Sequence, residues 1–229
     1  MSHNYSIAVI VPVLNEQAAL PTLLKQLQQL NADEVIVVDG GSTDESCKLL
    51  AASSVRWLSS SKGRSNQMNA GAALCQSDVL LFVHSDTVVD VTCLQAIKEV
   101  MQQPKIAGGR FDVRLSGAHS AFRMIAWFIN QRSRLTGIST GDQCQFVRRS
   151  LFVQMGGFPV QSLMEDLEFS KRLKRLGKIA SLKQKVMTSS RRWEKHGIRK
   201  TIILMWRLRW LYFWGVSSDR LATIYRQVR

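Results

Sequence analysis

The sequence predicts an α/β protein with a mostly parallel central sheet and helices on both faces. Short apolar runs rich in β-branched residues recur between stretches with helical spacing, and this alternation is typical of βαβ units. The 45% of apolar residues in a chain of 229 is enough for a substantial core. The predicted strands lie at 7–11, 34–38, 55–58 and 79–83, and the predicted helices near 17–30, 43–53, 65–76 and 91–102.

The alternation changes after about residue 104. The pattern there predicts a strand at 106–114, a helix at 118–135 and a Gly-rich passage at 137–145. A further strand is expected to begin at Phe146, and helices are expected near 163–176 and 194–214.

The net charge of +14 is concentrated at one end of the chain. Residues 1–170 have a charge balance of −1, whereas residues 171–229 have a balance of +15. Such a block is either a solvated basic surface or a region that attracts phosphates, nucleic acid or an anionic membrane.

The cysteines and the N-terminus both indicate a cytosolic protein. Cys47, Cys75, Cys93 and Cys144 lie far apart without a CxxC pair, which indicates reduced thiols rather than a disulfide framework or a zinc site. The first residues lack the basic segment and apolar stretch of a signal peptide, so we expect no export.

Polar residues follow each of the four predicted strands of the first half. In an open α/β sheet, ligands bind beyond the carboxyl ends of the strands, so four polar strand ends together predict a binding site. These segments are PVLNE at 12–16, DGGSTD at 39–44, SSSKGR at 59–64 and HSD at 84–86.

Two of these segments suit a nucleotide. Asp39 could accept a hydrogen bond from a base or a ribose, although Asp-Gly-Gly is also common turn chemistry. Lys62 and Arg64 precede a predicted helix whose N-terminus would supply free N–H groups to a phosphate. Cations are unfavourable at a helix start, so they indicate a bound anion unless they only point to solvent.

His84 and Asp86 have side chains on the same side of an extended segment. Mn²⁺ accepts both imidazole nitrogen and carboxylate oxygen, while Mg²⁺ prefers carboxylate, water and phosphate. The alternative is an aspartate that caps the next helix beside a packed histidine.

In this order and spacing, PVLNE, VDGGSTD, GR…NQMNAGAA and FVHSDT resemble the family 2 inverting glycosyltransferases, which have the nucleotide-diphosphosugar-binding GT-A fold. The similarity continues through GDQCQFVRRSLFVQMGGFP, LMEDLEFSKRLKRLGK and TSSRRWEKHG, and covers about 6–228. The chain looks most similar to a subgroup of small bacterial members with an HxDT metal motif and an RRWE segment.

The resemblance implies a division of the chain and a set of roles. The expected GT-A catalytic domain spans 1–193, with a nucleotide-binding half at 1–104 and an acceptor half at 105–193. A basic, aromatic helical extension follows at 194–229. The residues implied to bind the donor nucleotide or its diphosphate are Pro12, Asn15, Glu16, Asp39, Gly40, Lys62, Arg64, Ser85 and Asp86.

The resemblance also implies the groups that perform the transfer. His84 and Asp86 would hold a divalent cation, Mn²⁺ or Mg²⁺, on the diphosphate. Glu165 and Asp166 would be the acidic pair that supplies the general base, and Asp166 is our choice. Arg192 and Trp193 resemble part of a motif that processive members use to hold diphosphate and acceptor.

Two positions depart from the family pattern. His84 stands where the family has an acid, which leaves the identity of the metal open. Met68-Asn69 stands where many members have Arg-Asn, and Arg64, one turn earlier, is the candidate to replace that arginine.

The aromatic segment 201–216 is not a membrane-spanning helix, because arginines interrupt a run that is already short of about 20 apolar residues. On a helical wheel, Arg209 falls beside Trp206, Trp210 and Phe213. Three options remain open. The helix packs on the catalytic domain with its arginines paired to acids, lies in a membrane interface, or packs against a second subunit.

The resulting prediction is a cytosolic glycosyltransferase, with peripheral attachment to the inner face of the membrane as an option. It would move a sugar from a nucleotide-diphosphate donor, UDP by resemblance, to a hydroxyl acceptor that is either free or lipid-linked. A homodimer is an option and no nucleic-acid partner is expected. The alternatives are a sugar-nucleotide pyrophosphorylase, which would need an Arg-containing Gly-rich loop after the first strand, and a non-catalytic nucleic-acid or membrane binder.

Overall fold

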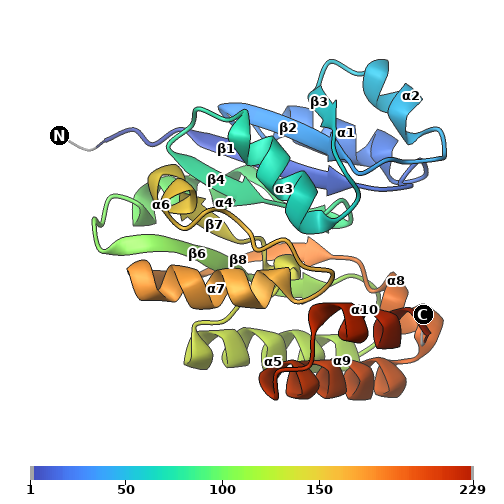
Figure 1. Ribbon diagram of the computed structural model, residues 1–229. Coiled ribbons are helices and arrows are strands. Elements are labelled where there is room, and N and C mark those ends of the chain that lie inside the picture. The colour runs from blue at the N-terminus through green and yellow to red at the C-terminus, as the bar shows by residue number, and fades with distance from the viewer. Residues whose placement is uncertain (1–2, 228–229) are drawn as a thin grey trace.

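One eight-stranded sheet forms the centre of the computed structural model, which describes residues 3–227 (Figure 1). The strands lie in the order β3-β2-β1-β4-β7-β6-β8-β5. Their bounds are Ile7–Val13 (β1), Glu34–Asp39 (β2), Arg56–Ser59 (β3), Val79–Phe82 (β4), Thr87–Val88 (β5), Ile106–Leu115 (β6), Phe146–Arg148 (β7) and Lys178–Thr188 (β8).

The first half forms the predicted parallel sheet. β1 lies between β2 and β4 and pairs with both in parallel, and β2 pairs in parallel with β3. The helices between these strands are Leu20–Gln29 (α1), Ser46–Ala51 (α2), Arg64–Ala73 (α3) and Val91–Val100 (α4). All four predicted strands and all four predicted helices of this half are confirmed.

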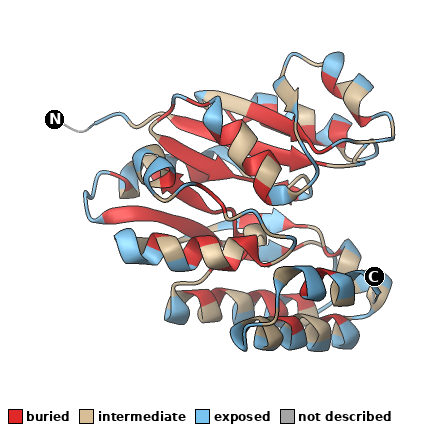
Figure 2. Cartoon of the chain, in the orientation of Figure 1, coloured by how far each residue is buried: buried red, intermediate tan, exposed pale blue. Residues whose placement is uncertain are grey.

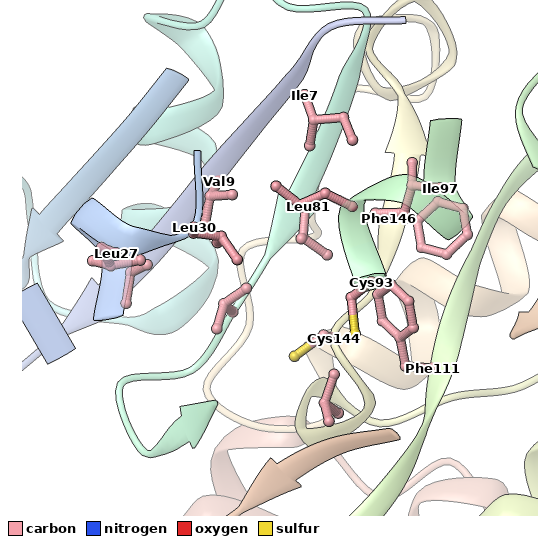
Figure 3. Close-up of a cluster of buried hydrophobic side chains, with 14 of the residues drawn as sticks. Ile7, Val9, Leu27, Leu30, Leu81, Cys93, Ile97, Phe111, Cys144 and Phe146 are labelled. Carbon is pink, nitrogen blue, oxygen red and sulfur yellow. The ribbon is translucent and has the colours of Figure 1, made fainter. Parts of the chain in front are cut away.

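Helices cover both faces of the sheet, so β1 is buried along its whole length (Figure 2). Val9 and its strand neighbours on one face pack with Leu27 of α1 and Ile97 of α4 (Figure 3). Ile10 on the other face packs with Met68 of α3. A Cβ on Gly71 would lie 2.6 Å from the Ile10 side chain, so the absence of a side chain at Gly71 allows α3 to approach the sheet closely.

The second half adds antiparallel and parallel pairings. β7 joins the two halves, since it is antiparallel to both β4 and β6, while β6 pairs in parallel with β8. The remaining elements before β8 are Ala121–Thr136 (α5), Gly141–Gln143 (η1, a 3-10 helix), Arg149–Gln154 (α6) and Glu165–Leu176 (α7). β8 and the two-residue β5 were not predicted. β8 contains three lysines and is only partly buried, so it lacks the apolar run of an inner strand.

A charged group is buried within this second half. Arg110 on β6 is 1% exposed, and its two terminal nitrogens donate to the carboxylate of Asp112, the backbone oxygen of Phe111 and that of Asn130. Arg134 of α5 also pairs with Asp112. Asp112 therefore neutralises a guanidinium group that has almost no access to water.

The C-terminal segment contains three helices, Arg191–His196 (α8), Ile198–Phe213 (α9) and Ser218–Gln227 (α10). The single helix predicted at 194–214 is interrupted at Gly197, whose φ of 81° is the left-handed conformation that glycine tolerates. The predicted boundary after residue 193 falls inside α8, and the division into domains stays a prediction.

α9 packs on the rest of the protein through Leu208, which is fully buried with Met164 and Leu167. Packing on the domain, one of the three options for 201–216, is therefore present. Neither Arg207 nor Arg209 forms a direct ion pair within residues 3–227, but the charges of Asp142 and Asp166 act on Arg209. Across the same residues, no helix combines the length and apolar character needed to cross a membrane. All four cysteines are free, as predicted.

Candidate active site

Hydrogen bonds tie the loop after β1 to the loops after β2 and β4. The side-chain oxygen of Asn15 accepts from the backbone N–H of Thr43 at 2.8 Å, and the backbone N–H of Asn15 donates to Ser42 Oγ at 2.8 Å. Glu16 Oε1 accepts from Ser85 Oγ at 3.0 Å. The structure thus brings together three of the strand ends that the sequence singles out. Pro12, also predicted here, is buried within β1.

Asp39 shapes the loop after β2. Its side chain is 1% exposed and accepts from the backbone N–H groups of Gly41 and Ser42 at 2.8 and 3.0 Å. Burial raises the pKa of Asp39, but the hydrogen bonds from Ser42 and Gly41 outweigh it and hold the pKa below its usual value. The alternative of turn chemistry is therefore present, and contact with a base stays a prediction.

Gly40 is required by a buried glutamine that the sequence analysis did not single out. A Cβ on Gly40 would lie 2.8 Å from the Gln67 side chain. Gln67 Nε2 donates to the backbone oxygens of Val13 and Val38 at 2.7 and 2.8 Å, where β1 and β2 end. It therefore fixes the base of the candidate nucleotide pocket, and its place in a helix of small residues gave no signal of this.

His84 lies against Gly141 of η1. A Cβ on Gly141 would come within contact distance of the imidazole, 2.5 Å from its Cε1. Burial holds the pKa of His84 well below its usual value, and the charges of Arg64 and Arg192 lower it further. The imidazole is therefore neutral near pH 7 and can offer a nitrogen lone pair to a metal.

Asp86 is exposed and lies beside the start of the C-terminal segment. Its backbone oxygen accepts from the N–H of Ser189 at 3.1 Å, and β5 directly after it pairs with the end of β8. Its carboxylate accepts a long hydrogen bond from Thr87 Oγ1 at 3.4 Å. The structure thus brings the HSD segment next to Arg191 and Arg192, about 100 residues further along the chain.

The acidic pair begins α7. Glu165 is 7% exposed, and burial together with the charge of Asp166 raises its pKa to about 7, while Arg64 opposes this. Asp166 Oδ2 accepts from the backbone N–H of Gly141 at 2.8 Å, and Oδ1 accepts from Leu167 at 2.8 Å. Burial raises the pKa of Asp166 despite the hydrogen bond from Gly141. Both carboxyl groups therefore hold a proton more readily than an exposed acid does.

The predicted cations divide into two groups. Arg64 at the start of α3 acts electrostatically on both His84 and Glu165, so it lies between the metal motif and the acidic pair. Arg192 on α8 also acts on His84, and its guanidinium lies 5.5 Å from the centre of the Tyr225 ring. Lys62 is exposed.

Trp193 packs away from these charged groups. It contributes to an apolar cluster with Phe122 and Ile125 of α5 and Ile198 of α9. Its position fixes α8, and therefore the helix that carries Arg192. A direct role of Trp193 in transfer stays a prediction.

A match to a known family decides which class of protein this site belongs to. Residues 8–156 match the family described as Glycosyl transferase family 2. The chain belongs to glycosyl transferase family 2. This family 2 member is 25% identical over 190 residues to the beta-monoglucosyldiacylglycerol synthase of Nostoc sp., covering 73% of this chain and 41% of the relative.

A second group of relatives carries a different name. The undecaprenyl-phosphate 4-deoxy-4-formamido-L-arabinose transferase of Serratia proteamaculans is 30% identical over 159 residues, covering 59% of this chain and 46% of the relative. This family 2 chain thus spans less than half the length of these curated relatives.

Solved structures of glycosyltransferases confirm the GT-A fold of this family 2 chain. S. aureus TarS residues 1–349 in complex with UDP-GlcNAc superposes with a TM-score of 0.60 at 18% identity, covering 80% of this chain and 58% of TarS. Glucosyl-3-phosphoglycerate synthase from Mycobacterium tuberculosis, in complex with Mn²⁺, UDP and glucosyl-3-phosphoglycerate, gives 0.57 at 19% identity, covering 79% and 70%.

Proposed function

We propose that this chain is an inverting glycosyltransferase that transfers a sugar from a nucleotide diphosphate, UDP in the first instance, to a hydroxyl acceptor. The observation that carries the proposal is the position of Gly141, which contacts His84 through its α-carbon and Asp166 through its N–H. The acidic pair therefore lies beside the strand end on which the donor diphosphate would rest. Membership of family 2 supports transfer over the pyrophosphorylase alternative.

The chemistry of a single displacement suits this arrangement. The acceptor oxygen bonds to the anomeric carbon as the bond from that carbon to the diphosphate oxygen breaks. Asp166 takes the proton of the acceptor hydroxyl, and its raised pKa makes it a stronger base than an exposed aspartate. The electron pair leaves with the diphosphate, whose growing charge Arg64 and Arg192 stabilise.

The donor side of the proposal extends to a metal. No group of three or more His, Cys, Asp or Glu in the described part of the chain could hold an ion alone. Asp86 and neutral His84 offer two donors, and Mn²⁺ or Mg²⁺ ordinarily completes its shell with diphosphate oxygens and water. The two residues therefore fit a cation that arrives with the nucleotide, as the Mn²⁺ and UDP complex of the mycobacterial synthase illustrates. Bound there, the cation would offset the charge of the diphosphate.

An attachment to the membrane surface is also part of the proposal. Trp206, Trp210, Phe213 and Trp214 are between 62% and 81% exposed along one side of α9, and Trp127 and Phe128 are more than half exposed on the neighbouring α5. Aromatic rings beside a basic segment suit the headgroup region of an anionic bilayer. The diacylglycerol in the name of the Nostoc relative supports an acceptor presented there.

The test of the proposal separates donor binding from transfer. Asp166→Asn should abolish release of UDP from a UDP-sugar, whereas stabilisation of the protein by UDP and Mn²⁺ in a thermal melt should persist. A non-catalytic binder of membrane or nucleic acid would show neither nucleotide stabilisation nor any effect of Asp166→Asn. If no nucleotide diphosphate raises the Tm with or without Mn²⁺, the assignment of the donor is wrong.

A further inference from the structure

Two arginines and two aspartates from four different elements, among them Asp166 of the acidic pair, lie within electrostatic range of one another. Arg132 belongs to α5, Asp142 to η1, Asp166 to α7 and Arg209 to α9. The charges of Arg209, Asp142 and Asp166 all act on Arg132, and those of the two aspartates also act on Arg209. We call these four partly buried residues the charge cluster.

Several side-chain atoms of the charge cluster are buried without a hydrogen-bond partner. Nε and Nη2 of Arg132, Nε of Arg209 and Oδ1 of Asp142 are inaccessible to solvent and have no hydrogen-bond partner within residues 3–227. Neither arginine forms an ion pair with a described residue. Burial and the charge of Arg209 lower the pKa of Arg132 to about 10. Buried charges are ordinarily paired, so these groups point to a ligand.

Arg110 is a structural arginine whose partners can be compared with those of Arg132 and Arg209. Its side chain is 1% exposed and its terminal nitrogens bind Asp112 and two backbone oxygens, so that only its Nε lacks a partner among the described residues. Arg132 and Arg209 have aspartates within electrostatic range but are not drawn into contact with them. Their charges therefore interact without a direct ion pair.

We propose that Arg132 and Arg209 bind an oxyanion of the acceptor, a phosphate or a carboxylate, next to the hydroxyl that receives the sugar. This inference rests on the proposed function, because it places the acceptor beside Asp166. A guanidinium group presents a planar set of donors that matches both oxyanions. The unpartnered oxygen of Asp142 accepts a hydrogen bond from a hydroxyl of the same molecule. The acceptor class is a hydroxylated phosphate or hydroxy acid, free or as a lipid headgroup.

The cluster is distinct from the arginines assigned to the donor. Arg64 and Arg192 act on His84, whereas Arg132 and Arg209 act with Asp142 and Asp166. Two arginine pairs with different electrostatic partners would serve two anions, the donor diphosphate and the acceptor. An electroneutral acceptor would need only the first pair.

The test uses calorimetric titration of the full chain saturated with UDP and Mg²⁺, so that the donor site is already occupied. Glycerol 3-phosphate and glycerate are the probes, and glycerol is the uncharged control. We expect at least one of the two anions to bind and glycerol to bind at least tenfold more weakly. Arg132→Gln and Arg209→Gln should each weaken the anion at least tenfold. Arg207→Gln, on the exposed side of the same helix, should leave its affinity unchanged.

A thermal melt distinguishes a variant that has lost anion binding from a variant that has failed to fold. If the two arginines are unpaired in the free protein, Arg209→Gln should leave the Tm equal or higher without anion, and should abolish the rise in Tm that glycerol 3-phosphate gives the wild type. A fall in Tm of several degrees without anion, together with equal binding of glycerol and glycerol 3-phosphate, would overturn the inference. The change in Tm on addition of UDP alone tests donor binding, and therefore the proposed function, independently of the anion.

A second arm distinguishes the two sources of the oxyanion. UDP release from a UDP-sugar is measured with glycerol 3-phosphate in solution and with vesicles of phosphatidylcholine that contain phosphatidylglycerol. Stimulation by the soluble phosphate identifies a free acceptor, and stimulation only by the phosphatidylglycerol vesicles identifies a headgroup. Stimulation by either that persists in Arg132→Gln and Arg209→Gln would contradict the inference.

Discussion

The N–H of Gly141 donates to Asp166 Oδ2 at 2.8 Å while the α-carbon of the same residue lies against the His84 imidazole. One glycine thus separates the proposed metal ligand from the proposed base. The position of the His84 imidazole depends on the absence of a side chain at residue 141, whereas the hydrogen bond to Asp166 comes from the backbone.

The first prediction follows from that contact. Gly141→Ala would place a Cβ in the space of the His84 imidazole and displace the ring. Because a shift of about 1 Å in a reacting group can cost about 100-fold, we expect kcat/KM for transfer to fall by about that factor. Thr22→Ala, at an exposed position of α1, is the control. Equal activity of the two variants would contradict the contact.

The second prediction concerns the metal. Asp86→Ala should abolish the additional thermal stabilisation that Mn²⁺ gives in the presence of UDP, because it removes the only carboxylate proposed as a ligand. His84→Asp should preserve that stabilisation, since it restores the acid that the family has at this position. Full metal dependence in Asp86→Ala would remove His84 and Asp86 from the metal site.

The third prediction is a pH dependence of stability. The pKa of Glu165 is raised from 4.5 to about 7 in the folded protein, so folding favours its protonated form. The associated stabilisation is complete below about pH 4.5 and is lost as the pH rises through about 7. Glu165→Gln should therefore be more stable than the wild type at pH 8, by about 1 to 3 kcal/mol.

Urea unfolding of the two proteins between pH 5 and pH 8 measures this difference. Glu45→Gln, at an exposed position, should show the same pH dependence as the wild type. The opposite result would be a free energy of unfolding of the wild type that rises between pH 5 and pH 8 relative to that of Glu165→Gln. It would show that the fold favours the ionised form of Glu165 and not the protonated form.

The fourth prediction concerns Asp112, which pairs with Arg110 and Arg134. Asp112→Ala would leave the buried guanidinium of Arg110 without its counter-charge. We expect a loss of about 3 to 5 kcal/mol in the free energy of unfolding, measured by denaturant titration. Lys48→Ala breaks the exposed pair with Glu45 and should cost less than about 1 kcal/mol. Similar losses in the free energy of unfolding of Asp112→Ala and Lys48→Ala would show that water screens the charge of Arg110.

The fifth prediction tests the membrane surface. Replacing both Trp206 and Trp210 by alanine should weaken sedimentation with phosphatidylglycerol vesicles by roughly tenfold or more, because both rings are exposed on α9. Val153→Ala on α6, also exposed, should bind vesicles like the wild type. Analytical ultracentrifugation tests whether the same surface packs against a second subunit. If the wild type is a dimer and the double variant is a monomer, the surface is a subunit interface.

Local patterns were sufficient for the first half of the fold and for the strand ends. An apolar run such as 79–83 predicts an inner strand from local sequence alone, and the polar segment 84–86 shows where that strand ends. The loops after β1, β2 and β4 converge because parallel neighbours end at the same edge, which is a property of topology.

Features that depend on distant partners were not predicted. β8 is a partly exposed, lysine-containing strand, and its pairing with β6, about 70 residues earlier, is what defines it. Arg209 falls among tryptophans on a helical wheel, yet the charges of Asp142 and Asp166 act on its guanidinium group. Asp39 has the residue type of a ligand-binding acid, but backbone N–H groups already occupy it.

The link between Asp86 and Ser189 has a consequence for biosynthesis. The donor half of the site is encoded in the first 90 residues, but its metal segment is held by a strand that ends at Thr188. A nascent chain can therefore build the nucleotide half early, while the complete site closes only after α8 and α9 have emerged from the ribosome. Transfer competence should appear late in synthesis, so unfinished chains would not consume donor sugar.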